Sequence, residues 1–393
     1  IEEHDMLTRE ENETLTQVGR GTPGGELLRR YWLPVACAGE LTEEKPIKAF
    51  GLLGENLVVY RDKSGRYGVV AEQCPHREAS LAFGRVDAEG IRCPYHGWKF
   101  DCTGKCLEQP AEPLDGGFKD KIKHTAYPAE RLGGLIWTYL GPEPRPLLPR
   151  WDVLCWDNGQ RWIEKHEIYN CNWLQPTENS VDPSHLYWLH GDTAHLAPTV
   201  DHYEEEHAFT PFEYGIMKRR VTPGRKPGDA PVVDQHPLLF PSTLRHVFRE
   251  GLLTGRVRHN LQVRVPVDDA HTQVFVVFFS PNETDRSPAD GDTPWEFFRI
   301  RDDKGEYRLD QVLVQDAMAW ETQGAPTDRT QEHLGVGDEG IILLRKILRE
   351  QIEVVRNGGE PLGVVRDPGK NRLIEFEVVN ERIGLFGKEK KVA

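Results

Sequence analysis

Two short motifs of cysteine and histidine lie in the first third of the chain. Cys74 and His76 form Cys-x-His, and after sixteen intervening residues Cys93 and His96 form Cys-x-x-His. Two thiolates and two imidazoles suit either a tetrahedral zinc site or a two-iron cluster with the thiolates on one iron and the imidazoles on the other. Zinc fingers usually pair Cys with Cys and His with His, whereas each motif here supplies one of each, and a proline follows each cysteine. The pattern therefore favours the iron–sulfur cluster.

A second group of metal-ligand residue types follows further along the chain. The segment Asp182-Pro-Ser-His185-Leu-Tyr-Trp-Leu-His190 places two histidines after a proline that favours a helix start, with Asp182 in the N-cap position. On an ideal helix, five residues set the two imidazoles about 140° apart. The two histidines therefore converge on one ion only if the helix is distorted or the ion lies between them.

A carboxylate is needed to complete this group. Asp316 lies on an expected helix where Leu309, Leu313 and Trp320 share its face, so that it is an acid within an apolar stripe. A buried acid needs a partner, and a metal ion is one. Two histidines and one carboxylate form the facial triad of non-haem iron sites, which leaves positions open for O2 and water. The alternative carboxylates are Asp310 and Glu321.

The two motifs, in this order, resemble those of the Rieske non-haem iron oxygenases. By this resemblance Cys74 and Cys93 bind the inner iron of a [2Fe–2S] cluster, while His76 and His96 bind the outer iron. The resemblance also implies a reductive activation of O2 that needs both metal centres.

The resemblance assigns the second group as well. It makes His185, His190 and Asp316 the ligands of a mononuclear Fe(II). Asp182, together with Asn179, becomes the bridging group that links this iron to a Rieske histidine of a neighbouring subunit. Capping a helix and bridging two subunits compete for the Asp182 carboxylate, and we favour the bridging role.

Further stretches are similar to the phthalate dioxygenase branch of this family, which includes related aromatic-acid O-demethylases. They are Gly21–Trp32, Arg264–Asp269, Gln315-Asp316 and Gln323–Thr330. The branch implies a terminal oxygenase component that hydroxylates a phthalate-like or benzoate-like acid by ring cis-dihydroxylation. The alternative is a monooxygenase that removes a methyl group from a methoxy-aromatic, lignin-derived acid. A more distant alternative is a Rieske electron carrier without oxygenase activity, which would need no second iron.

The resemblance also implies partners. The family forms homotrimers or stacked pairs of trimers, because the two metal centres of one chain are too far apart for fast electron transfer. The spacing Gly-x-Gly-x-x-Gly occurs once, at Gly19–Gly24, but it lies in the expected helical arm and follows no expected strand, so it is no dinucleotide fingerprint. There is also no plant-type ferredoxin motif, so electrons must come from another protein. The expected donor is an NADH-dependent iron–sulfur flavin reductase.

The residues that bind substrate are harder to predict. An aromatic carboxylate in an apolar pocket calls for an arginine fork. Arg219, Arg220, Arg245 and Arg249 follow the histidine motif, and Ser180 lies between Asn179 and Asp182. We expect Ser180, Arg219 and Arg245 to be the first candidates.

Local patterns divide the chain into three parts and predict an α+β protein. We expect residues 1–34 to form a helical arm that packs on the catalytic domain. Residues 35–147 are expected to form a small all-β Rieske domain of short strands, which ends near the proline-rich linker Gly141–Arg150. Residues 148–393 form the mononuclear iron domain, with strands near 161–169, 256–267 and 273–280 and a helix over 338–356. The resemblance implies a helix-grip-like α/β catalytic domain with an antiparallel sheet.

Composition excludes several classes of protein. The 393 residues carry a net charge of −14, which opposes binding to nucleic acids and anionic membranes. Seven cysteines are too few for a disulfide scaffold. With no apolar run long enough for a membrane helix and no secretory signal, the expected location is the cytoplasm.

Overall fold

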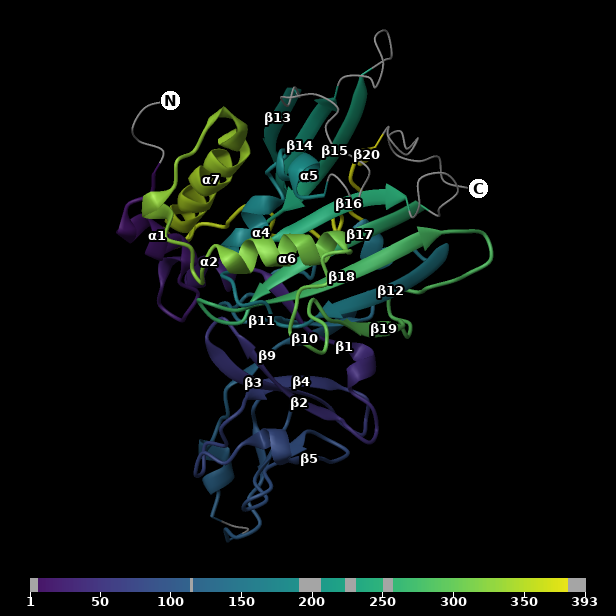
Figure 1. Cartoon of the computed structure of the whole chain (residues 1–393). Coiled ribbons are helices and arrows are strands. Elements are labelled where there is room, and N and C mark those ends of the chain that lie inside the picture. The colour runs from purple at the N-terminus through teal and green to yellow at the C-terminus, as the bar shows by residue number, and fades with distance from the viewer. Residues whose placement is uncertain (1–5, 114–115, 191–205, 223–230, 250–256, 381–393) are drawn as a thin grey trace.

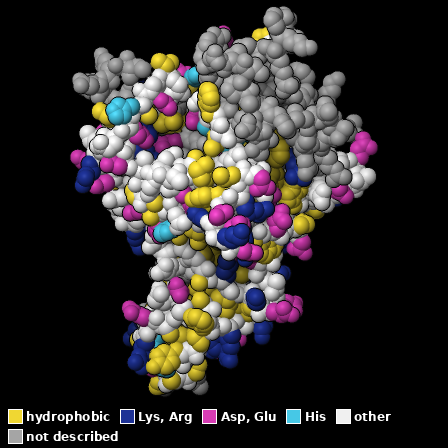
Figure 2. All heavy atoms as spheres, viewed as in Figure 1, with side chains coloured by type: hydrophobic (Ala, Val, Ile, Leu, Met, Phe, Trp, Pro, Cys, Tyr) yellow, Lys and Arg dark blue, Asp and Glu magenta, His cyan; other side chains and the backbone are white. Residues whose placement is uncertain are grey.

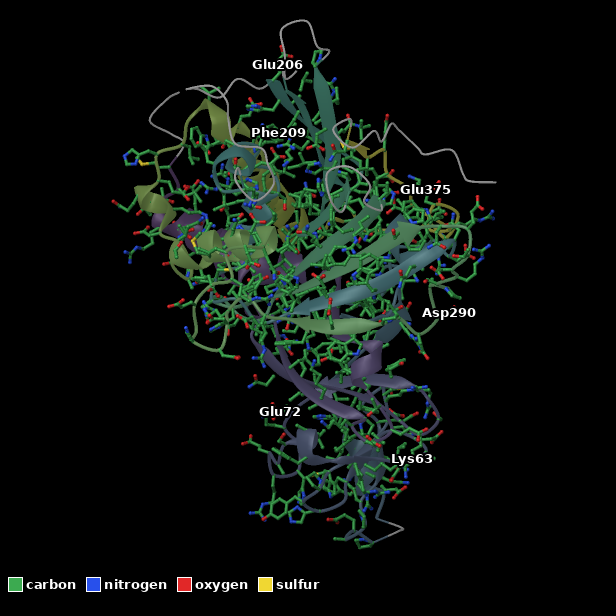
Figure 3. All side chains as sticks on the ribbon, turned by 45° about the vertical axis from the view of Figure 1, so that its right-hand side comes forward. Lys63, Glu72, Glu206, Phe209, Asp290 and Glu375 are labelled. Carbon is green, nitrogen blue, oxygen red and sulfur yellow. The ribbon has the colours of Figure 1, made fainter. Side chains whose placement is uncertain are left out.

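The computed structural model describes residues 6–113, 116–190, 206–222, 231–249 and 257–380. A larger, sheet-rich part lies above a smaller lobe in the view of Figure 1, and Figure 3 shows the same two parts after a turn, with Lys63 and Glu72 on the smaller lobe. The expected α+β class, with a small all-β part and a larger part built on a mainly antiparallel sheet, is confirmed.

The smaller lobe contains two four-stranded sheets. The first has the order β2-β3-β4-β9 and consists of β2 Ile47–Leu52, β3 Glu55–Arg61, β4 Tyr67–Ala71 and β9 Ala126–Tyr127. The second runs β5-β6-β7-β8, with β5 Arg85–Val86, β6 Ile91–Arg92, β7 Lys99–Phe100 and β8 Cys106–Glu108. In the turn between β3 and β4, Asp62 Oδ1 accepts hydrogen bonds from the Ser64 and Arg66 amides, each at 3.0 Å.

A three-stranded sheet, β1-β11-β10, joins this lobe to the larger part. Its strands are β1 Trp32–Cys37, β10 Ala129–Leu132 and β11 Leu135–Tyr139. All residues of β1 and β11 are buried, and they belong to the same apolar core as the strands of the large sheet. The proline-rich segment 141–150 then crosses to the larger part, where Leu147 donates its amide to the Val365 carbonyl at 2.8 Å.

The large sheet has nine strands in the order β13-β14-β15-β16-β17-β18-β12-β19, with β20 beside β15. The strands are β12 Gly159–His166, β13 Glu206–Phe212, β14 Gly215–Thr222, β15 Val232–Leu239, β16 Thr243–Arg249, β17 Val257–Pro266, β18 Thr272–Pro281, β19 Trp295–Phe298 and β20 Val379–Asn380. β12, β17 and β18 confirm the three strands predicted for this part. The four strands β13 to β16 were not predicted.

Helices cover this sheet and carry the candidate iron ligands. They are α3 Asp152–Cys155, α4 Leu174–Asn179, α5 His185–Trp188, α6 Val312–Thr322 and α7 Glu339–Arg356. In Figure 1, α6 crosses in front of β16 to β18, and α5 lies beside β14 and β15. Val314, Ala317 and Trp320 of α6 share an apolar cluster with Val276 and Phe278 of β18. The face of the sheet beneath α6 is therefore the face nearest Asp316.

The N-terminal residues form two short helices against α7. These are α1 Arg9–Thr16, which begins with a capping box between Thr8 and Glu11, and α2 Pro23–Leu28. Glu11 also pairs with Arg349 of α7 at 2.7 Å. None of the helices in the described ranges has the length and apolar character needed to cross a bilayer.

Candidate metal centres

The two Cys/His motifs form matching turns at the tip of the smaller lobe. The Cys74 amide donates to the Ala79 carbonyl at 3.0 Å, and the Cys93 amide donates to the Trp98 carbonyl at 2.8 Å. Each turn closes with a residue at positive φ, Glu78 in the first and Gly97 in the second. The backbone alone thus brings the two motifs into equivalent positions.

The donor set of these turns fits a cluster with unlike irons. Cys74 and Cys93 are buried, with 1% and 3% of their surface exposed, whereas the His76 and His96 rings lie outside them with centroids 4.6 Å apart. Burial raises the pKa of the Cys74 thiol to about 12, so a thiolate there requires a cation beside it. Two inner thiolates and two outer imidazoles are the ligands of a Rieske cluster.

Aromatic side chains hold the two imidazoles in place. Trp98 stacks on the His76 ring with centroids 4.4 Å apart, and Tyr95 lies 3.8 Å from the His96 ring. Phe83, Tyr95 and Phe118 remain exposed at this end, with 81%, 55% and 41% of their surface accessible. Figure 2 shows apolar and basic side chains together at the tip of this lobe.

The second group converges as the sequence suggested. His190 Nε2 lies 3.0 Å from Asp316 Oδ1, and His185 Nε2 lies 3.9 Å from the same oxygen. One ligand atom from each of the three residues lies within 4.8 Å of the others. The His185 and His190 rings lie with centroids 5.4 Å apart, although the backbone of Leu189 between them and α5 is still helical.

Each histidine of this group has a polar neighbour near Nδ1. The Gln315 amide oxygen lies 2.8 Å from His190 Nδ1 and accepts its proton, so that with a metal bound Nε2 would be the ligand atom. Asp182 Oδ2 lies 3.4 Å from His185 Nδ1, which has no hydrogen-bond partner among the described residues. Two imidazoles and a carboxylate are a donor set that fits a divalent iron. Gln315 was not among the predicted site residues, although it precedes Asp316 directly in the sequence.

Asp182 divides its two oxygens between two tasks. Oδ1 accepts from the amide and the hydroxyl of Ser184, both at 2.8 Å, while Oδ2 faces His185. Burial tends to raise the pKa of this carboxyl, but His185 and the Ser184 hydrogen bonds outweigh burial and hold the pKa well below its usual value. The N-cap of α5 is Ser184, so the N-cap position predicted for Asp182 is wrong, and its carboxylate instead holds the turn before the helix.

A buried ion cluster fixes helix α4, which leads into this segment. Glu178 accepts from Arg329 Nη2 and from Arg345 Nε, both at 2.7 Å, and Arg345 also pairs with Glu332. Glu178 is only 6% exposed and Arg329 is fully buried. The cluster connects α4 to α7, and Asn12 of α1 accepts from Arg329 at 3.3 Å.

The predicted substrate residues do not gather with the metal ligands. Ser180 is 2% exposed and donates its hydroxyl to the Pro176 carbonyl at 3.3 Å, inside its own helix turn. Arg245 is buried and pairs with Asp152 at 2.9 Å. Arg219 is exposed. Because neighbouring residues of a strand point to opposite faces, Arg245 faces away from the side that carries His246.

Two other predicted residues complete this account. Asn179 is half-buried at the end of α4, next to Ser180. The side chain of Arg249 lies outside the described residues. Arg220, in contrast, does reach the iron segment, since its Nη1 donates to the Pro183 carbonyl at 3.5 Å.

Comparison with known proteins supports the same conclusion. Residues 31–119 match the family model of the Rieske [2Fe-2S] domain. The chain is 38% identical to the 5,5'-dehydrodivanillate O-demethylase oxygenase subunit of Sphingobium sp. (strain NBRC 103272 / SYK-6), over 95% of this chain and 87% of that one. It is 33% identical to the phenoxybenzoate dioxygenase subunit alpha of Ectopseudomonas oleovorans, over 89% and 87%. It is also 29% identical to the phthalate 4,5-dioxygenase oxygenase subunit of Pseudomonas putida, over 95% and 92%.

Solved structures share the fold. Pseudomonas putida CBB5 NdmA with caffeine superposes with a TM-score of 0.65 at 23% identity, covering 85% of this chain and 94% of that one. Dicamba monooxygenase bound to dicamba gives a TM-score of 0.61 at 17% identity, covering 84% and 99%. With the Rieske domain, the second donor set and relatives aligned over nearly its whole length, the chain belongs to the Rieske non-haem iron oxygenases, as an oxygenase subunit.

Proposed function

We propose that the chain is the terminal oxygenase component of a multicomponent system that oxidises a substituted aromatic acid with O2. The observation that carries this proposal is the presence of two separate iron-type donor sets in one chain, one at an exposed tip and one between helices and a sheet. An electron carrier would need only the first. The relatives that align over most of the chain include subunits named for dioxygenation of phthalate and phenoxybenzoate and for O-demethylation of dehydrodivanillate.

In this proposal His185, His190 and Asp316 hold the mononuclear iron, which when bound supplies O2 activation. Gln315 orients the His190 ring through Nδ1 so that its Nε2 would be the ligand atom, and Asp182 lies 3.4 Å from His185 Nδ1. Cys74, Cys93, His76 and His96 hold the Rieske cluster. Asp182 and Asn179 link the iron segment to a Rieske histidine of a neighbouring subunit in a trimer or a stacked pair of trimers.

Electrons come from a separate protein that docks near the exposed histidines. The exposed apolar side chains Phe83, Tyr95 and Phe118 and the neighbouring Arg77, whose guanidinium lies 5.4 Å from the Tyr95 ring, support this position. In the carbazole 1,9a-dioxygenase system, the oxygenase has been seen in complex with a ferredoxin. For this chain we infer an NADH-dependent iron–sulfur flavin reductase.

Product analysis under labelled O2 tests the reaction type. The oxygenase is supplied with a heterologous reductase and a pool of phthalates, benzoates and methoxybenzoates, and the products are weighed by mass spectrometry. Two labelled oxygens in one ring product establish cis-dihydroxylation. Loss of a methyl group with release of formaldehyde establishes O-demethylation, which the 38% identical relative favours. NADH oxidation without any oxygenated product would refute the proposal.

The ligand assignment has its own test. Replacing Asp316 with Ala should remove the mononuclear iron and the turnover while leaving the Rieske absorbance unchanged, because the two donor sets are separate. Retained turnover in that variant would show that Asp316 is not the ligand.

A further inference from the structure

A polar cluster lies on the sheet face beneath the iron ligands and belongs to neither metal centre. The strand register pairs Arg220 with Asp234 across β14 and β15, and His246 with Asn260 across β16 and β17. Directly opposed residues in an antiparallel pair share one face. The rings of His236 and His246 lie with centroids 4.7 Å apart, which shows that β15 and β16 present these residues to the same side.

Two anchors place this face next to the mononuclear iron segment. At one end, Arg220 donates to the carbonyl of Pro183, two residues before His185. At the other end, Phe248 of β16 packs into the apolar cluster that contains Val314 and Ala317, the neighbours of Asp316 on α6. His246 lies on β16, two residues before Phe248, and Asn260 lies opposite it on β17 (Figure 1).

The inner members of the cluster satisfy one another. Asp234 is 1% exposed, accepts from Arg220 Nε at 2.9 Å and lies 3.3 Å from His236 Nδ1. Asp234, His236 and His246 meet the spacing for a metal ion. A cation there would lie against the Arg220 guanidinium that already occupies the Asp234 carboxylate, so this cluster does not suit a metal. Its arrangement instead fixes the tautomer and orientation of His236.

The outer members, His246 and Asn260, lack partners. Asn260 is 3% exposed, and its Oδ1 has no hydrogen-bond partner among the described residues. No described side chain or backbone group bonds to the ring nitrogens of His246. The pKa of His246 lies well below its usual value, mainly because the ring is buried and next because His236 is near. Lys218 and Arg220 lower it further, and only Asp234 acts to raise it. The pair is therefore an uncharged imidazole beside an uncharged amide.

We propose that the His246–Asn260 pair binds a phenolic hydroxyl of the aromatic substrate. This inference rests on the proposed function and deepens it, since it names a substituent that the substrate must carry. A hydroxyl donates one hydrogen bond and accepts others, so it can donate to Asn260 Oδ1 and accept from the N–H of His246. A carboxylate only accepts, and would leave Asn260 Oδ1 without a donor. Leaving a buried polar group unpaired is costly, which gives the pair its selectivity.

Equilibrium binding tests the proposal without turnover. We would titrate the iron-loaded oxygenase, without O2, with 4-hydroxy-3-methoxybenzoate and with 3-methoxybenzoate, which lacks only the hydroxyl. Wild type should bind the hydroxy acid about tenfold more tightly, as expected for one well-placed pair of hydrogen bonds. His246→Phe and Asn260→Leu, which keep side-chain volume, should bring the two affinities together. Equal affinities in wild type, or an unchanged preference in both variants, would overturn the proposal.

Two further variants separate a hydroxyl from a carboxylate at this position. Asn260→Asp still accepts from a hydroxyl, so the preference should remain, whereas a carboxylate held there would be repelled and both acids would bind about tenfold more weakly or worse. That second result would also overturn the proposal. His246→Gln, which retains a donor and an acceptor, should restore the preference lost in His246→Phe if the protein folds, as judged by the Rieske absorbance.

The control is His271→Phe, on the turn between β17 and β18, where 43% of the side chain is exposed. This change should leave both affinities unaltered. If wild type binds neither acid and forms no oxygenated product from the pool above, the proposed function fails and the hydroxyl subsite fails with it. If it binds neither acid but oxidises another member of the pool, only the subsite fails. If wild type binds both acids equally, only the subsite fails.

Discussion

The Glu178 ion cluster offers the sharpest test of how the iron segment is held. Glu178→Gln keeps the size of the side chain but removes the one carboxylate among the described residues that lies within hydrogen-bond distance of Arg329, since Glu332 is 4.0 Å away. Arg345 keeps Glu332 as a partner, whereas Arg329 would be a fully buried cation facing an amide. Breaking a buried ion pair from one side costs about 3–5 kcal/mol.

This cost converts into a measurable shift. An unfolding entropy of about 2.1 cal/mol/K per residue corresponds to roughly 0.8 kcal/mol/K for a chain of 393 residues. The midpoint of thermal unfolding, followed by circular dichroism, should therefore fall by about 4–6 °C. The matched control is Glu332→Gln, which contacts the same Arg345 but has a side chain 23% exposed, and should shift the midpoint by about 1 °C or less. Equal shifts in the two variants would refute the claim that buried charge, rather than the number of hydrogen bonds, stabilises α4.

Three other outcomes follow from the same geometry. Below about pH 4.5 the midpoint of thermal unfolding of wild type should fall more steeply than that of Glu178→Gln. The two arginines hold the pKa of Glu178 in the folded state below its usual value despite its burial, so the stability that the ionised carboxylate contributes is lost as the pH falls through this lowered pKa. Parallel curves for the two proteins would contradict this. Gln315→Leu should weaken iron binding by about 10–100-fold, measured as iron per chain at unchanged Rieske absorbance, whereas Gln311→Leu at the start of α6 should not. Asp182→Ala should retain both metals but stop reduction of the mononuclear centre in a single turnover, and normal reduction would remove Asp182 from the electron path.

The local motifs were predictable because their ligands lie close in sequence. Cys74 and His76 share one turn, Cys93 and His96 share another, and His185 and His190 are separated by one short helix. Asp316 was found through its apolar surroundings. The proline after Asp182 suggested a competition between capping and bridging for its carboxylate; in the structure Oδ1 binds Ser184 and Oδ2 lies near His185, and the bridge to a neighbouring subunit stays a prediction.

The wall of the site was not predictable in the same way. Strands β14 to β16 carry charged and polar residues toward the helices, so they lack the apolar alternation by which strands are recognised. His246 and Asn260 meet only because of the register between β16 and β17. The same register turns Arg245 to the opposite face, where Asp152 neutralises it. A one-residue change of register would exchange the two faces, and no local pattern fixes that choice.

The joint between the two parts of the chain has a consequence for protein engineering. Glu40, in the helical turn that follows β1, lies between Lys48 of β2 and Lys165 of β12, and it accepts from Lys165 at 2.8 Å. Lys165 is 8% exposed, so its ammonium depends on this acid. A chimera that exchanges the Rieske lobe between two oxygenases would leave Lys165 buried without a partner unless the incoming lobe brings an acid at the Glu40 position. The compatible pairs of lobes and catalytic parts can therefore be chosen by matching residues 40, 48 and 165 before any gene is assembled.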